Sequence, residues 1–98
     1  MVHMVFMKLE EGFLTEEIFR EYRETFAAIA ADMPEEVRRA EVLRNCVPRE
    51  QNMDILIRLD LRDAESLPKY LRHPRHLAIG EKMNPHVLKL ASFDYEEE

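Results

Sequence analysis

Apolar and polar residues follow two different repeats along the chain. Four stretches alternate with a period of two, as β-strands do: residues 2–9, 37–46, 53–61 and 86–95. Two stretches, 15–32 and 66–84, carry apolar residues every three or four positions, as amphipathic helices do. The order strand, helix, strand, strand, helix, strand is that of the split βαβ unit. We therefore predict a single α+β domain over residues 1–98, with a ferredoxin-like fold (βαββαβ) and a four-stranded antiparallel sheet.

Both helical stretches have predicted starts. Thr15 is a good N-cap for the first. Asp63 or Ser66 caps the second, and Ser66 is the better choice because Pro68 then falls in the first turn. The apolar stripe of the first helix consists of Ile18, Tyr22, Phe26, Ile29 and Met33, with Phe19 and Ala30 beside it. We expect the charged residues between them to face water, with Glu16 pairing with Arg20 one turn later.

The second helical stretch is interrupted within residues 70–76, which hold one phenol, two imidazoles and two guanidiniums. Pro74 disfavours helical backbone at His73 and can itself open a new helix. We predict one helix ending near Arg72 and another starting at Pro74, with the His73 side chain capping the turn that follows. His76 then falls in the first turn of the new helix, where the helix dipole slightly favours a neutral imidazole.

The first and last strands are apolar on both faces. In the first strand Val2, Met4 and Phe6 alternate with His3, Val5, Met7 and Leu9, and in the last strand Val87, Ala91 and Phe93 alternate with Leu88 and Leu90. The helices of a split βαβ unit cover only one face of the sheet, so the other face needs a partner. Because the chain has no further elements, we predict a homodimer whose two sheets face each other.

Composition and charge exclude several classes of function. Apolar residues make up 46% of the chain and charged residues 35%, a balance typical of a folded domain and not of a disordered one. Acidic residues outnumber basic ones 20 to 14, and no basic stripe alternates with aromatic residues, so we expect neither nucleic acid nor an anionic membrane as a partner. A single cysteine, Cys46, fits a reducing compartment, and no membrane-spanning run or signal peptide is recognisable. These features predict a cytoplasmic location, and Glu96 to Glu98 are expected to form a frayed acidic tail.

Several short motifs together resemble the stress-responsive A/B barrel (Dabb) family. They are the opening stretch 2–9 (VHMVFMKL), Arg44-Asn45 before a loop, Tyr70 with His73-Pro74-Arg75-His76, and the closing stretch 92–95 (SFDY). The resemblance spans nearly the entire chain. It implies a dimeric α+β barrel and, in some members, a cavity between the sheet and the helices.

The functions of this family are divided. Some plant members are stress-induced, very stable proteins with no known reaction, many bacterial members have no assigned activity, and a plant polyketide cyclase closes a poly-β-keto chain by aldol condensation. That cyclase uses a tyrosine and a histidine at positions that match Tyr70 and His76, with a first-strand histidine that matches His3. Arg75 stands where the family often has alanine, so we expect its guanidinium to narrow or charge the mouth of the cavity.

The candidate catalytic residues are therefore Tyr70 and His76, and the candidate ligand-binding residues are these two together with His3, Val5 and Met7. An imidazole is a usable base at neutral pH, and a phenol can hold the carbonyl oxygen next to which a proton is removed. Alternatively, Tyr70 and His76 form a structural hydrogen bond that closes the helix break. His3 either points into the dimer cavity or is a satisfied interior histidine.

Two function classes stay open. The first is a Dabb protein of unassigned activity, with a small internal cavity that binds an apolar ligand. The second is a cofactor-free enzyme, a polyketide cyclase-like enzyme or a lyase, in which His76 abstracts a proton with the help of Tyr70. A third possibility, a cofactor-independent monooxygenase, is known for similar dimeric barrels and rests on analogy of fold alone. No cofactor is predicted, and no metal either, because the spacing of the four histidines is not that of a helical His pair with a glutamate base.

Overall fold

The computed structural model describes residues 1–97, and it has the predicted order of elements. The strands are β1 (Val2–Leu9), β2 (Val37–Arg44), β3 (Ile55–Leu61) and β4 (Val87–Tyr95), and the α-helices are α1 (Glu16–Asp32), α2 (Ser66–Leu71) and α3 (Pro74–Met83). Two short 3-10 turns, η1 (Glu11–Phe13) and η2 (Asn84–His86), precede α1 and β4. The strands form one antiparallel sheet in the order β2-β3-β1-β4, which confirms the ferredoxin-like fold.

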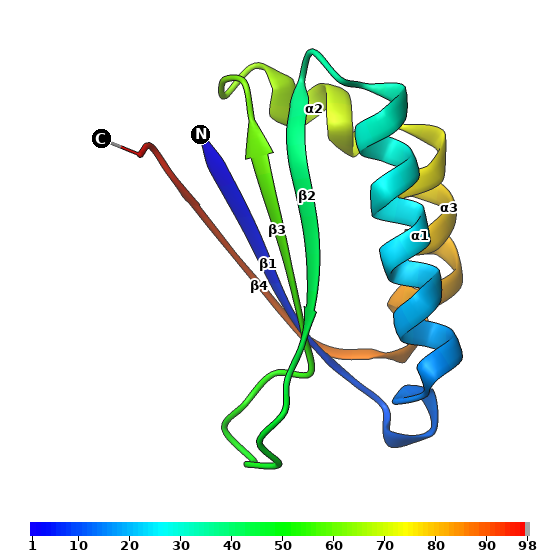
Figure 1. Ribbon diagram of the computed structural model, residues 1–98. Coiled ribbons are helices and arrows are strands. Elements are labelled where there is room, and N and C mark those ends of the chain that lie inside the picture. The colour runs from blue at the N-terminus through cyan, green and yellow to red at the C-terminus, as the bar shows by residue number, and fades with distance from the viewer. Residues whose placement is uncertain (98) are drawn as a thin grey trace.

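The three α-helices pack on one face of the sheet, and within residues 1–97 the other face carries no helix (Figure 1). The core lies between the sheet and α1. It contains the alternate β3 residues Ile55, Ile57, Leu59 and Leu61 and the α1 residues Phe19, Tyr22, Phe26 and Ile29. The buried residues of α1 recur with the helical period and those of β3 with the two-residue period, and the two sets pack against each other in this layer, as predicted.

Helix α1 begins as predicted, because the Thr15 side chain accepts a hydrogen bond from the Ile18 amide at 3.2 Å. The expected pair between Glu16 and Arg20 is not formed. Glu16 instead pairs with Arg44 at the end of β2, and this contact lowers the pKa of the Glu16 carboxyl. The spacing of charges along α1 could not identify Arg44 as the partner, because Arg44 lies on a different element, β2.

Of the two candidate caps of α2, the preferred one, Ser66, is wrong, and the side chain of the other, Asp63, binds the start of the helix. Ser66 lies inside the helix and is fully buried, while the Asp63 carboxylate accepts hydrogen bonds from the Ser66 amide at 3.0 Å and the Ser66 hydroxyl at 2.8 Å. These bonds lower the pKa of Asp63. A carboxylate three residues upstream can satisfy two donors at once, which a serine in the capping position cannot do.

A β-bulge changes the predicted faces of β4. Lys8 pairs with Lys89 but Leu9 pairs with Val87, so β4 has one extra residue at Leu88. Val87 is thereby turned to the helix-covered side, where it packs against the core, and does not share a face with Ala91 and Phe93 as predicted.

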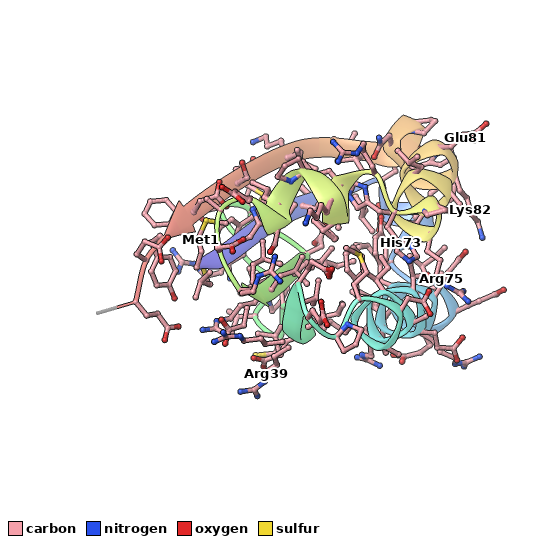
Figure 2. The ribbon with its side chains drawn as sticks, turned by 90° about the horizontal axis from the view of Figure 1, so that it is seen from above. Met1, Arg39, His73, Arg75, Glu81 and Lys82 are labelled. Atoms are coloured by element: carbon pink, nitrogen blue, oxygen red, sulfur yellow. The ribbon has the colours of Figure 1, made fainter. Side chains whose placement is uncertain are left out.

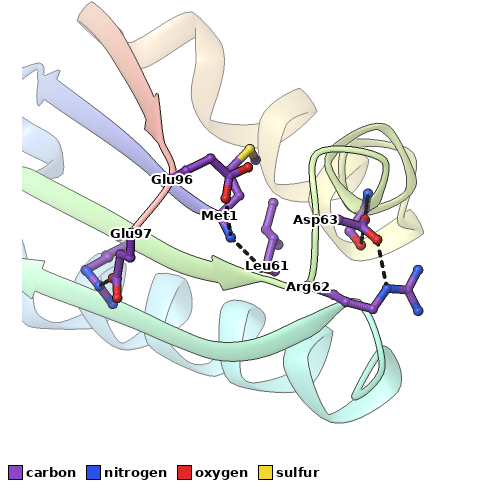
Figure 3. Close-up of polar contacts among 8 residues, drawn as sticks. Met1, Leu61, Arg62, Asp63, Glu96 and Glu97 are labelled. Carbon is purple, nitrogen blue, oxygen red and sulfur yellow. Dashed lines mark hydrogen bonds and ion pairs between the residues drawn. The ribbon is translucent and has the colours of Figure 1, made fainter.

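The acidic end of the chain is tied down as far as the structure describes it. The Glu96 carboxylate lies 3.6 Å from the Met1 amino group, and the Glu97 carboxylate lies 2.9 Å from the Arg58 guanidinium (Figure 3). The same amino group donates a hydrogen bond to the Leu61 carbonyl at 2.9 Å. The predicted frayed tail is therefore wrong for Glu96 and Glu97, and Glu98 lies outside the described residues.

Candidate functional site

A cavity of about 400 Å³ lies between the helix-covered face of the sheet and the helices. All five predicted site residues line it: His3, Val5, Met7, Tyr70 and His76. The three β1 residues come from one face of a central strand, which is flanked by β3 and β4. His3 thus points into a cavity within one protomer. The volume falls in the range of small-molecule sites.

The helix break that carries His76 is formed as predicted. Helix α2 ends at Leu71, and α3 begins at Pro74. The His73 Nδ1 accepts a hydrogen bond from the Arg75 amide at 3.0 Å, so its Nε2 donates to the Asp32 carboxylate at 3.1 Å. His73 is therefore a capping residue that also joins α3 to the end of α1.

His76 is held in one tautomer. Its Nδ1 lies 3.0 Å from the Leu71 carbonyl oxygen, and because a carbonyl can only accept, Nδ1 carries the proton. In the neutral ring Nε2 then has the lone pair, and it has no hydrogen-bond partner among residues 1–97. Burial lowers the pKa of His76, and His3 and His73 add to this lowering, while the bond to Leu71 opposes it. The imidazole is therefore neutral at pH 7 and able to accept a proton.

Tyr70 lies beside His76 without a hydrogen bond between them. The two ring centroids are 4.7 Å apart at an interplanar angle of 59°, so the predicted structural hydrogen bond is not formed. In the described part of the chain the Tyr70 hydroxyl has no hydrogen-bond partner, although only 1% of the residue is exposed. Every fully buried side-chain oxygen in residues 1–97 has a hydrogen-bond partner. Because the Tyr70 hydroxyl has none, it is not fully buried and borders open space. Burial raises the pKa of Tyr70, which keeps its proton available for donation.

Asp94 completes the polar end of the cavity, and the sequence pattern did not identify it. It sits opposite His3 in the β1–β4 ladder, and its carboxylate accepts a hydrogen bond from the His3 Nδ1. The His3 ring meets the Tyr70 ring edge-on, with centroids 5.9 Å apart. Two imidazoles, one phenol and one carboxylate therefore meet at one end of the cavity.

Arg75 does not charge the cavity mouth, and that prediction is wrong. Its guanidinium lies 3.5 Å from the Asp32 carboxylate and is half-exposed over the end of α1 (Figure 2). At the first turn of α3, positions 75 and 76 point about 100° apart, so His76 faces the sheet while Arg75 faces α1. The remaining wall of the cavity is largely apolar, with Phe26, Ile57, Leu67, Leu71, Ile79 and Leu90.

Tyr22 and Gly80 also line the cavity, and neither was among the predicted site residues. Tyr22 was assigned to the core stripe of α1, and its hydroxyl lies 3.9 Å from the sulfur of Met7, another lining residue. Gly80 lies one turn after His76 and leaves the wall without a side chain there. Helical spacing identified the buried side of each helix but not which buried atoms border empty space.

No three His, Cys, Asp or Glu side chains in residues 1–97 come together in a way that could hold a metal ion. None of the helices in this part of the chain is both long enough and apolar enough to span a membrane.

Comparison with known proteins agrees with this architecture. The family described as "Stress responsive A/B Barrel Domain" (Dabb) matches residues 1–97. The chain belongs to this family. The resemblance drawn from its motifs is thereby confirmed, and Dabb membership by itself assigns no specific activity. No curated protein sequence matches this Dabb chain.

Solved structures similar to this Dabb protein share its fold at low sequence identity. A dimeric protein of unknown function and ferredoxin-like fold from Bacteroides fragilis is 23% identical, with a TM-score of 0.83 over 98% of this chain and 94% of that one. A Dabb family protein from Mesorhizobium loti is 20% identical, with a TM-score of 0.67 over 99% and 95%. A hydroxynitrile lyase from Passiflora edulis is 13% identical, with a TM-score of 0.75 over 96% and 89%.

Proposed function

We propose that this Dabb protein is a cofactor-free enzyme that binds a small carbonyl compound in its cavity and removes a proton next to the carbonyl group. The observation that carries the proposal is the orientation of His76. Its Nδ1–H donates to the Leu71 carbonyl, so Nε2 carries the lone pair and has no hydrogen-bond partner among residues 1–97. His76 lines a largely apolar cavity, where this nitrogen can act as a base. An imidazole with a lowered pKa stays in the basic form at neutral pH.

The neighbouring groups supply the other half of the reaction. The His76 Nε2 takes the proton from the α-carbon, and the electron pair of the broken C–H bond moves onto the carbonyl oxygen as an enolate. The Tyr70 hydroxyl has no partner among residues 1–97 and can donate a hydrogen bond to that oxygen. The raised pKa of Tyr70 keeps the phenol protonated while it does so.

Abstraction of an α-proton is also the first step of an aldol closure, so the polyketide cyclase-like reaction is one form of this proposal. The similar fold of a protein described as a hydroxynitrile lyase supports a carbonyl or cyanohydrin substrate. The alternative, an apolar-ligand carrier without turnover, has less support. A carrier gives no reason to place an unpaired phenol beside an unpaired imidazole nitrogen in the wall of the cavity.

Proton abstraction can be tested without knowing the natural substrate. We would follow the acetyl protons of 2-acetylnaphthalene by NMR in D₂O at neutral pH and measure how fast the protein exchanges them for deuterium. His76→Asn keeps a donor near the Leu71 carbonyl but has no ring Nε2, so we expect the exchange rate to fall at least ~100-fold. His86→Asn is the matched control, because His86 stacks on Phe13 and pairs with Glu10 outside the cavity. Exchange that continues at the wild-type rate in His76→Asn would contradict the proposal.

We further propose that the protein works as a homodimer in which the helix-free faces of two sheets meet. That face carries Met4, Phe6, Leu43, Leu56 and Phe93, and of these Leu43 and Phe93 are exposed. Proteins of the same fold from Bacteroides fragilis and Thermobifida fusca are described as dimeric, which supports this assembly. The site-bearing cavity lies on the opposite face, so each protomer would keep its own site.

Sedimentation of dilute protein tests the dimer. We expect a dimer for the wild type and a monomer for Phe93→Glu, because the substitution places a charge in an apolar contact. Leu77→Glu, on the exposed side of α3, is the control that should stay dimeric. A stable wild-type monomer would refute the proposed dimer, and the deuterium exchange assay would still test the proposed activity independently.

A cytoplasmic location stays our prediction from the single Cys46.

A further inference from the structure

A second phenol borders the cavity at a distance from the group of His3, Tyr70 and His76. Tyr22 lies on α1 one turn before Phe26, and the Phe26 ring is the one that contacts Tyr70 and His76, with centroid distances of 6.1 and 6.5 Å. The Tyr22 residue is only 3% exposed, yet it forms part of the cavity wall. Phe26 therefore stands between two tyrosines that line the same cavity.

The hydroxyl of Tyr22 has a weak partner. The Met7 Sδ, at 3.9 Å, is its only hydrogen-bond acceptor within residues 1–97, and a thioether sulfur accepts poorly. A buried tyrosine usually pairs its hydroxyl with an oxygen or nitrogen. Burial raises the pKa of Tyr22 to about 12, so the hydroxyl stays a donor at any physiological pH.

The position of Met7 places this donor away from the reacting end. His3 and Met7 lie on the same face of β1 four residues apart, a separation of roughly 13 Å along the strand. On α3, Gly80 follows His76 by one turn in the same direction, and it adds no side chain to the cavity wall there. The ligand space thus runs from a polar end, past an apolar middle lined by Val5 and Ile57, to the end lined by Met7 and Tyr22.

We propose that Tyr22 is a specificity-determining residue that donates a hydrogen bond to a second oxygen of the substrate. The substrate class is then a carbonyl compound with an apolar middle and an oxygen acceptor at its far end. This inference rests on the proposed function for the placement of the carbonyl group, and it adds the group that the far end of the cavity recognises. Tyr22 does not touch the reacting atoms, so its effect lies in binding and not in proton transfer.

Two ketones of similar shape test the inference. In 6-methoxy-2-acetylnaphthalene an ether oxygen stands at the end opposite the acetyl group, and in 6-ethyl-2-acetylnaphthalene a methylene replaces that oxygen. We would measure the dissociation constants of both for the wild type, for Tyr22→Phe and for Tyr95→Phe. Tyr95 is the control because it lies on the last strand, outside the cavity wall.

We expect the wild type and Tyr95→Phe to bind the methoxy ketone ~5- to 10-fold more tightly than the ethyl ketone, the size of one net hydrogen bond. Tyr22→Phe should bind the two ketones equally, with an unchanged affinity for the ethyl ketone. An equal preference in Tyr22→Phe and wild type, or no preference in the wild type, overturns the inference. If Tyr22→Phe also lowers the melting temperature while the preference persists, the hydroxyl is structural, bound to Met7.

The same samples separate this inference from the proposed function. Exchange of the acetyl protons in D₂O reports on His76 and Tyr70, whereas the preference between the ketones reports on Tyr22. Loss of the preference in Tyr22→Phe with exchange retained supports both statements. Exchange that depends on His76 without any preference for the methoxy ketone overturns only the role of Tyr22, and a failure of the wild type to bind either ketone overturns both.

Discussion

Gly80 offers a direct test of whether the cavity wall is shaped for a ligand at a cost in stability. The residue is inside α3, where glycine destabilises a helix by about 1 kcal/mol relative to alanine. Its backbone has no positive φ, so the conformation does not require glycine. A Cβ added there would meet only the Asn84 side chain, with Nδ2 at 3.4 Å and Cγ at 4.0 Å. Neither backbone strain nor close packing explains the glycine, whereas an open cavity wall does.

We therefore expect Gly80→Ala to stabilise the fold by roughly 0.5–1 kcal/mol, which raises the melting temperature of a domain of this size by about 2–8 °C. The same methyl group narrows the cavity one turn from His76, so the affinity for 2-acetylnaphthalene should fall several-fold. Thermal unfolding followed by circular dichroism and a ligand titration measure the two effects. Gly12→Ala is the matched control, because a methyl group added at Gly12 would meet no atom within 4 Å and would lie outside the cavity wall.

A lower melting temperature for Gly80→Ala would refute the claim that glycine destabilises α3 at this position. A higher melting temperature with an unchanged affinity for 2-acetylnaphthalene would refute the claim that the absent side chain keeps the cavity wide enough for a ligand. Gly12→Ala should change stability without any change in ligand affinity.

Two further predictions concern the histidines at the helix break. Because burial lowers the pKa of folded His76 below 6.5, the unfolded chain binds a proton first as the pH falls, so the free energy of unfolding should decrease below about pH 6.5. Urea unfolding at pH 7.5 and 5.5 should show a larger loss for the wild type than for His76→Asn, and equal losses would contradict the assigned cause. His73→Ala removes the cap on the Arg75 amide and should cost about 1 kcal/mol in urea unfolding, whereas His73→Asn, with a good capping side chain, should recover most of it. A cost as large for asparagine as for alanine would show that the bond to Asp32 matters more than the cap.

The features that follow from local sequence were predicted well. Pro74 restricts the backbone on both sides of itself, so the end of α2, the start of α3 and the cap at His73 could all be placed from a few residues. The alternation of β1 placed His3 on the same face as Val5 and Met7, and the structure brings all three to the cavity.

The features that depend on pairing between distant segments were missed. The partner of His3 is Asp94, and their contact depends on the register of β1 against β4, which no local pattern determines. The bulge at Leu88 is part of the same register, and it reversed the predicted face of Val87. Helical periodicity placed Tyr22 in the core, but whether its hydroxyl meets another side chain or empty space depends on the packing of α1 against the sheet.

The place of β1 in the middle of the sheet determines when the site can form during folding. The strand that begins at Val2 pairs with β3 and with β4, so both of its neighbours are later in the chain. His3 and Asp94 are 91 positions apart, and a contact of that sequence separation forms only after a large loop has closed. A growing chain that has not yet added β4 contains Tyr70 and His76 but lacks one wall of their cavity. We therefore expect folding to be slow for a protein of this length, with ligand binding appearing together with the last cooperative step rather than before it.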